Sequence, residues 1–211
     1  MKTFTRKHQE DLTPLEAIQL LKQGNERFVN NLKINRNLLQ QINETSESQN
    51  PFAIVLSCID SRTSAELIFD QGLGDIFSCR IAGNILNDDL IGSMEFACKV
   101  AGSKLVVVLG HTGCGAIKGA CDRVKMGKLT GLLKKVSPAI KLARTANHNH
   151  DPNSDSFVDE VASLNVKVVL NQIGKQSEIL TEMVRREEIK IVGGMYDIST
   201  GIVSFIERED G

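Results

Sequence analysis

Two short apolar runs, each followed at once by side chains that bind soft metals, constrain the fold of this chain most strongly. Residues 52–57 lead into Cys58, and residues 106–109 lead through a glycine into His111 and Cys114. Short apolar runs rich in β-branched residues predict buried strands. If the two strands are parallel neighbours, their carboxyl ends meet at one edge of an open α/β sheet, where ligands bind. We therefore expect the three side chains to lie together.

Two thiolates and an imidazole form a ligand set suited to Zn²⁺. Three protein ligands and one open position are typical of a catalytic zinc site, whereas structural sites usually have four ligands. Water in the open position would have its pKa lowered to about 7, so hydroxide would be available as a nucleophile at neutral pH. Taken singly, Cys58 or Cys114 would be interpreted as a small buried apolar residue. With His111 beside them, the pattern predicts a catalytic zinc centre.

Asp60 and Arg62 follow Cys58 on the loop that leaves the first strand. From this position the Asp60 carboxylate reaches either the metal or the Arg62 guanidinium. Paired with Arg62, it would accept a hydrogen bond from the hydroxide and orient it toward substrate. On the metal, it would fill the fourth position and close the site. An Asp-Ser-Arg triplet alone would indicate a surface turn, but the adjacent Cys58 favours a catalytic pair.

Helices and strands alternate along the rest of the chain. Residues 13–31 have helical apolar spacing behind Thr13-Pro14-x-Glu16, which is a good helix start, and residues 35–46 predict a weaker helix. The other predicted helices are 64–71, 90–100, 115–125, 158–173 and 179–186, and the other predicted strands are 75–80, 104–110, 189–196 and 201–206. The pattern predicts one α/β domain over residues 1–211 with a mainly parallel sheet flanked by helices. Residues 1–48 would form an N-terminal helical arm and the last strand an antiparallel edge.

Charge and cysteine content narrow the function classes. The 25 Lys and Arg side chains balance 26 Asp and Glu, so no nucleic-acid or membrane partner is expected, and a small neutral or singly charged substrate fits. No apolar run approaches about 18 residues and residues 1–8 lack the apolar core of a signal peptide, which predicts a cytoplasmic protein. The five cysteines are widely spaced without a Cys-x-x-Cys pair, which argues against a disulfide framework. Cys79, Cys98 and Cys121 are assigned no role.

The combination of Cys58-x-Asp60-Ser61-Arg62 with His111-x-x-Cys114-Gly115 resembles the zinc signature of the β-class carbonic anhydrases. The resemblance runs from about residue 12 to the end of the chain and includes residues 12–17, 24–28, 74–77 and 80–84. It implies a zinc enzyme that interconverts CO₂ and bicarbonate through zinc-bound hydroxide. It also implies that both arrangements of Asp60 exist.

Resemblance to the plant-type subgroup implies further substrate-binding residues. Gln49 matches a glutamine whose amide holds substrate, and Phe77 and Ala82 match positions of an apolar wall. The backbone amide of Gly115 is a candidate oxygen contact. Phe96 stands where many members have tyrosine, so the wall is kept while the hydroxyl is missing. From the residues alone, Gln49 would be a solvated loop residue.

The resemblance also bears on assembly and regulation. It implies a homodimer or homotetramer in which the N-terminal arm crosses onto a partner subunit, whereas the residues themselves favour helices packed on their own domain. A bacterial subgroup binds inhibitory bicarbonate with a tryptophan three residues before the first zinc cysteine. Val55 occupies that position and the chain has no Trp, so we expect no such pocket in its usual form.

Two other functions are compatible with the same metal-ligand motifs. Relatives with the same ligands act on carbon disulfide or carbonyl sulfide, which are small, linear and apolar like CO₂. A non-catalytic zinc- or bicarbonate-binding protein is a second alternative, against which Asp60 and Arg62 argue. His148 and His150 lie in a polar, turn-rich segment, where histidines are more often solvated than ligands.

Overall fold

The computed structural model describes residues 3–146 and 154–206. Five strands form one sheet in the order β2-β1-β3-β4-β5. The strands are β1 (Ala53–Ser57), β2 (Ile76–Arg80), β3 (Leu105–His111), β4 (Lys190–Tyr196) and β5 (Val203–Ile206). All pairings are parallel except that of β4 with β5. The predicted fold class, a mainly parallel sheet with an antiparallel edge strand, is confirmed.

The central strands are buried on both faces, which explains their unbroken apolar sequences. Every residue of β1 and β3 is buried, as expected where helices cover both faces of a parallel sheet. The register pairs Ser57 with Leu109, so both strands end at nearly the same level. Strand β1 lies between β2 and β3, so the chain leaves β1 toward β2 on one side and leaves β3 toward β4 on the other. That reversal opens a crevice at the carboxyl edge of an α/β sheet.

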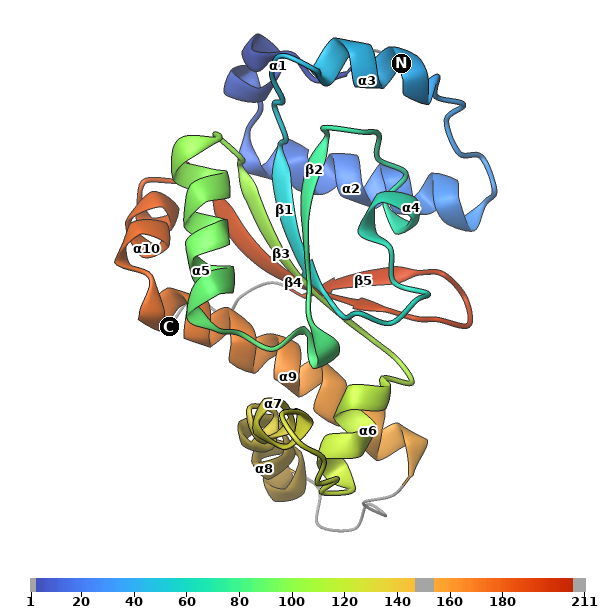
Figure 1. Ribbon diagram of the computed structural model, residues 1–211, viewed down its shortest axis with the longest axis vertical. Helices are drawn as coiled ribbons and strands as arrows, with labels where there is room; N and C mark the ends of the chain where they lie inside the picture. Colours follow the sequence, from blue (N-terminus) through green and yellow to red (C-terminus); the bar gives the residue numbers. More distant parts are fainter. Residues whose placement is uncertain (1–2, 147–153, 207–211) are drawn as a thin grey trace.

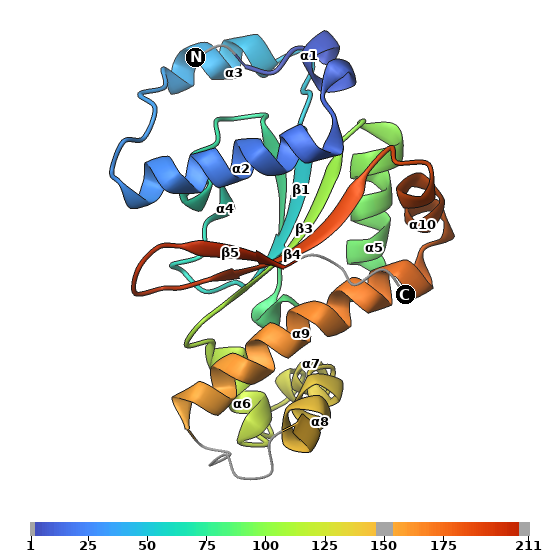
Figure 2. The same ribbon diagram turned by 180° about the vertical axis from the view of Figure 1, so that it is seen from behind.

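Helices cover both faces of the sheet and extend beyond its carboxyl edge (Figures 1 and 2). Helix α2 packs with α4 on one face, while α5, α9 and α10 pack on the other. Helices α6, α7 and α8 lie against α9 around a third apolar cluster that includes both ligand cysteines. The helices are α1 (Arg6–Asp11), α2 (Pro14–Val29), α3 (Leu38–Thr45), α4 (Ala65–Ile68), α5 (Asp88–Glu95), α6 (Gly115–Cys121), α7 (Leu129–Lys134), α8 (Ser137–Ala146), α9 (Asp155–Gln176) and α10 (Glu178–Arg185).

Helix α2 packs against the sheet of its own chain. Its start is a capping box, in which Thr13 accepts from the Glu16 amide and the Glu16 carboxylate accepts from the Thr13 amide. Ala17 and Leu21 are fully buried in the core beneath the sheet. The Asn25 side chain donates to the carbonyl of Gly201, two residues before β5. In this part of the predicted arm, the helix packs on its own domain, as the residues alone favour.

Several elements differ from the predicted ones. Helices α1, α7 and α8 lie where no element is predicted, and α4 is shorter than predicted. Residues 82–84 form a single 3₁₀ turn, and residues 96–100 form a π-helical turn at the end of α5. Within the described residues, no helix combines the length and the apolarity needed to cross a bilayer. His148 and His150 lie outside the described residues.

Candidate metal centre

The carboxyl ends of β1 and β3 bring Cys58, His111 and Cys114 together. Cys58 follows β1, His111 is the last residue of β3, and Cys114 is the N-cap of α6. All three residues are buried, and one ligand atom from each lies within 4.8 Å of the others. The two sulfurs are 3.9 Å apart. These distances are observed within one chain and need no second copy.

The His111 ring is held in the tautomer that a metal ligand needs. Its Nδ1 lies 2.8 Å from the Thr112 carbonyl oxygen, and since a carbonyl only accepts, Nδ1 carries the proton. The other nitrogen, Nε2, is buried and has no hydrogen-bond partner among the described residues. Burial alone would lower the pKa of His111, but the neighbouring Cys58 sulfur, the Thr112 carbonyl and the Asp60 charge together outweigh burial and raise the pKa. An unprotonated Nε2 beside two sulfurs is a metal-binding geometry.

The two thiol groups lie in contact with each other. This contact lowers the pKa of Cys58 and raises that of Cys114. The amide of Gly83 also donates to the Cys58 sulfur, at 3.3 Å. A second thiolate at 3.9 Å would add like charge in a buried site, which is unfavourable without a compensating cation. The pair is therefore electrostatically suited to a divalent ion.

Zinc fits this donor set. A tetrahedral ion with Zn–S bonds of about 2.3 Å would hold two sulfurs about 3.8 Å apart, close to the 3.9 Å between Cys58 and Cys114. The unpartnered Nε2 of His111 supplies a third ligand. Within the described residues, the group of metal-binding side chains at this site has three members, which leaves one position of a tetrahedron open.

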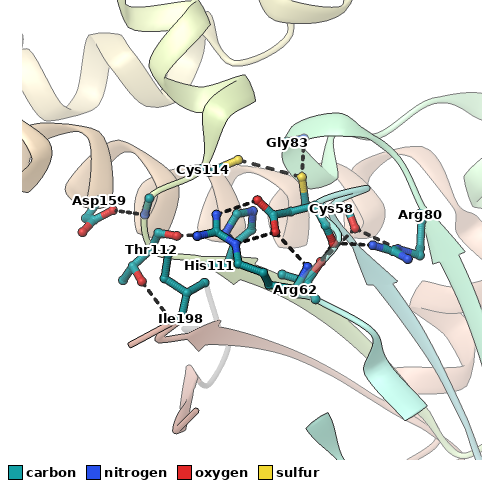
Figure 3. Close-up of polar contacts among 12 residues, drawn as sticks. Cys58, Arg62, Arg80, Gly83, His111, Thr112, Cys114, Asp159 and Ile198 are labelled. Carbon is teal, nitrogen blue, oxygen red and sulfur yellow. Dashed lines mark hydrogen bonds and ion pairs between the residues drawn. The ribbon is translucent and has the colours of Figure 1, made fainter. Parts of the chain in front are cut away.

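Asp60 and Arg62, which follow Cys58 in the chain, form a two-pronged ion pair, and Arg62 is labelled in Figure 3. The Arg62 Nε donates to Oδ1 at 2.9 Å and its NH2 group to Oδ2 at 2.8 Å, while the Arg62 amide donates to Oδ1 at 3.0 Å. These hydrogen bonds hold the pKa of Asp60 well below its usual range. Asp60 is therefore a carboxylate at neutral pH, and it faces Arg62 in this structure.

The sequence analysis assigns no role to Thr63 or Arg80, yet both support the ligand loop. The Thr63 hydroxyl lies 3.0 Å from the Cys58 carbonyl and 2.9 Å from the Asp60 carbonyl. The Arg80 side chain, at the end of β2, donates to the same two carbonyl oxygens. The signals for Arg80 in the sequence were its place at the end of a predicted strand and in the 80–84 segment of the family resemblance, and Thr63 had none.

The five predicted substrate-binding residues lie in three places. Ala82 begins the turn that contains Gly83, and Gly115 begins α6 directly after Cys114, so both adjoin the metal group. Gln49 is exposed before the amino end of β1, at the opposite end of that strand from Cys58. Phe77 and Phe96 pack edge to face, with ring centroids 6.3 Å apart, and line a groove beside β2. None of these three residues adjoins the metal group of its own chain.

A family model for carbonic anhydrase matches residues 53–203. The chain belongs to the β-class carbonic anhydrase family. This confirms the family inferred from the metal-ligand motifs, and with it the predicted enzyme class, a carbonic anhydrase. The matched region includes β1 and β3 and therefore all three residues of the metal group.

Individual relatives agree with this assignment. The chain is 34% identical to carbonic anhydrase 2 of Mycobacterium tuberculosis, over 89% of this chain and 90% of the relative. It is 33% identical to a carbonic anhydrase of Mycolicibacterium smegmatis, over 90% and 92%. Among solved structures, the β-carbonic anhydrase CafA of Aspergillus fumigatus superposes with a TM-score of 0.75 at 22% identity, over 93% and 92% of the two chains. A β-carbonic anhydrase from Sordaria macrospora, described as tetrameric, gives 0.69 at 22% identity, over 76% and 82%.

Proposed function

We propose that this β-class carbonic anhydrase binds Zn²⁺ and catalyses the reversible hydration of CO₂ to bicarbonate and a proton. The observation that carries the proposal is the three-membered group of Cys58, His111 and Cys114 beside the Asp60 and Arg62 ion pair. A three-ligand site with one open position is typical of catalytic zinc. Membership of the carbonic anhydrase family supports CO₂ as substrate.

Each side chain has a distinct task in this proposal. Cys58, His111 and Cys114 hold the ion, which when bound lowers the pKa of a water ligand toward neutrality. Asp60 accepts a hydrogen bond from the attacking oxygen and orients it toward substrate. Arg62 keeps Asp60 ionised and correctly aimed through its two side-chain hydrogen bonds. The proton released in the reaction passes to buffer.

The proposed ligands require reduced thiols. All five cysteines are free, and a cytoplasmic location suits a site in which two of them act as thiolates. Oxidation of Cys58 and Cys114 to a disulfide would remove both sulfur ligands at once. A reducing compartment would therefore preserve the metal centre.

We further propose that two copies of the chain complete each other's substrate site. Gln49, Phe77 and Phe96 do not adjoin the metal group of their own chain, although the family resemblance gives them contacts with substrate. Phe96 is 53% exposed and lies over a groove of about 620 Å³ beside the edge strand β2. A second copy docked there would cover this apolar surface and bring the three residues to its own metal.

Metal analysis combined with turnover tests the proposal. We expect about one zinc per chain and CO₂ hydration, followed by stopped-flow indicator change, that depends on zinc. Carbon disulfide and carbonyl sulfide should be assayed side by side with CO₂, because the ligand set alone does not separate these substrates. Faster turnover of either sulfur compound would assign the chain to a hydrolase on the same scaffold. Zinc-replete protein with no turnover of any of the three would identify a binding protein.

A further inference from the structure

We propose that helix α9 positions the metal centre by holding the loops of its two cysteine ligands through Asp159 and Asn165. The inference rests on the proposed zinc site and assigns two positioning residues that are not ligands. Neither side chain contacts the three ligand atoms. Each acts through one glycine, Gly113 for Asp159 and Gly83 for Asn165. Figure 3 labels Asp159, Gly83 and the three metal-binding residues.

Asp159 holds the loop between His111 and Cys114. Its Oδ1 accepts from the Gly113 amide at 2.8 Å. Gly113 has a φ of +61°, a conformation that glycine adopts readily, and a Cβ at this position would lie 3.0 Å from Ile198. The opposite side of the loop is held by the turn after β4, because the Thr112 hydroxyl oxygen accepts from the Ile198 amide at 3.1 Å. The loop is therefore fixed from two sides.

Asn165 holds the glycine that contacts the other sulfur ligand. The side chain is buried, and its Nδ2 donates to the Gly83 carbonyl at 3.0 Å. The Gly83 amide in turn donates to the Cys58 sulfur at 3.3 Å. Gly83 has a φ of +69°, so its position is not set by regular secondary structure. The Asn165 bond fixes this glycine and thereby keeps a donor on Cys58.

The cost of burying Asn165 supports a role in the site. Its Oδ1 is buried and has no partner among the described residues. An unsatisfied buried oxygen costs on the order of 1–3 kcal/mol, which offsets the roughly 1 kcal/mol that one hydrogen bond contributes to stability. The amide nitrogen, in contrast, donates to the carbonyl of the glycine whose own amide contacts Cys58. The Asn165 side chain therefore serves the metal centre rather than the stability of the fold.

A single helix couples the two contacts. Asp159 and Asn165 are six residues apart on α9, which corresponds to about 9 Å along the helix axis. Between and beyond them, Val161, Val166 and Val169 are buried in the apolar clusters, so the helix is firmly seated. Cys58 and Cys114 belong to different loops, and α9 keeps those loops in fixed relation before the metal arrives. Such preorganisation strengthens metal binding.

Two variants and two matched controls test this inference. Asp159→Ala and Asn165→Ala remove the contacts, while Asp155→Ala and Asn171→Ala make the same changes at exposed positions of the same helix. Asp159→Asn keeps an oxygen acceptor and should restore the Gly113 contact. Zinc affinity is measured by chelator competition on full-length protein. We expect a loss of about 10- to 100-fold for each test variant, with both controls and Asp159→Asn close to wild type.

The cobalt-substituted protein gives a readout that a general loss of stability would not produce. Asn165→Ala should shift the thiolate-to-cobalt charge-transfer band to lower energy, because Cys58 loses the hydrogen bond from Gly83. Asp159→Ala should alter the ligand-field bands through a distorted tetrahedron. Zinc affinities and cobalt spectra equal to wild type in both variants would overturn the inference. If Asn165→Ala does not fold, Asp159→Ala decides the outcome. Absence of zinc from wild type would instead refute the proposed metal centre.

Discussion

Cys58 and Cys98 show that neighbours, rather than burial, distinguish a candidate ligand from a structural cysteine. Both residues are almost fully buried. Burial raises the pKa of the Cys98 thiol to about 12, whereas the contact with the Cys114 sulfur lowers the pKa of Cys58 despite its burial. The sequence separates the two cysteines because Cys58 ends a strand next to the His111 strand. It does not reveal Thr63 and Arg80, whose backbone contacts depend on the tertiary fold.

The first prediction concerns the ligands. Cys58→Ser, His111→Ala and Cys114→Ser should each lose nearly all bound zinc, because removal of one of three protein ligands severely weakens metal binding. Zinc content is measured by elemental analysis of purified protein. Cys121→Ser, at a buried cysteine that is not in the metal group, should retain about one zinc per chain. Full zinc content in His111→Ala would refute the ligand assignment.

The second prediction concerns Asp60. Asp60→Asn should keep zinc but lose on the order of 10²-fold or more in CO₂ hydration, comparable to the loss of one transition-state hydrogen bond elsewhere. The neutral amide does not form the charged pair with Arg62 and is a weaker acceptor.

In wild type, CO₂ hydration should rise toward alkaline pH. The pKa of Asp60 is too low for Asp60 itself to titrate near neutrality, so this rise reports ionisation of the water ligand. An Asp60→Asn variant with full zinc content and wild-type CO₂ hydration rates from acid to alkaline pH would exclude the proposed role of the Asp60 and Arg62 pair.

At the scale of elements, apolar periodicity predicts the sheet and misses helices that polar contacts hold. Helix α1 has one buried residue, Gln9, whose side chain donates to the carbonyls of Pro51 and Ala101 at 2.7 and 2.8 Å. No apolar stripe marks such a helix. The α7 and α8 region differs, since Leu133, Val136, Ala139 and Ala143 are buried with helical spacing. A periodicity count there would have indicated a helix.

Gly24 supports a third prediction. Helix α2 passes so close to the α4 segment that a Cβ on Gly24 would lie 1.8 Å from the Phe69 carbonyl oxygen. Gly24→Ala should therefore lower the free energy of unfolding by about 2 kcal/mol, since overpacking outweighs the gain of about 1 kcal/mol in helix propensity. Gly131→Ala in α7, where a Cβ meets nothing within 4 Å, should raise it by about 0.5 kcal/mol or more. Urea unfolding checks both, and a stabilised Gly24→Ala variant would contradict the close approach of α2 to the end of α4.

The fourth prediction concerns the ion cluster that ties the segment between α2 and α3 to the end of α4. Asp70 is almost fully buried and accepts from Arg27 at 2.6 Å and from Arg36 at 2.5 Å. Asp70→Asn should lower the free energy of unfolding by about 3 kcal/mol, because two cations lose their partner in a largely buried position. Urea denaturation at neutral pH measures the difference from wild type.

The pH dependence of that difference follows from the pKa of Asp70. Burial works to raise this pKa, but the hydrogen bonds from Arg27 and Arg36 outweigh it, so the folded-state pKa is lowered. The stabilisation is then fully present above the unfolded-state pKa of about 3.9 and is lost as pH falls through the folded-state value. Wild type and Asp70→Asn should therefore converge in stability toward strongly acid pH. A constant difference down to that range would mean that the charge of Asp70 is not the cause.

At the scale of the whole molecule, one chain contains the complete metal group, but the residues of the proposed substrate wall lie away from that group in the same chain. The sequence predicts which residues belong to each part, but periodicity and spacing carry no information on which copy supplies them. The wall residues Phe77, which is half-buried in β2, and Phe96, which is exposed after α5, line the groove beside β2, an edge strand of the sheet. An unpaired strand edge next to an exposed aromatic ring favours association.

The last prediction tests that association. Wild type should sediment as a dimer or a larger assembly, and Phe96→Asp should shift it toward monomer, because a carboxylate would have to be buried in the contact. CO₂ hydration by Phe96→Asp should fall as the protein dissociates, because Phe77, Phe96 and Gln49 would no longer reach a partner's metal. Zinc content should stay at about one per chain. Met126→Asp, at a similarly exposed apolar residue outside the groove, should leave sedimentation and activity unchanged. A fully active monomer of wild type or of Phe96→Asp would show that one chain is sufficient for catalysis.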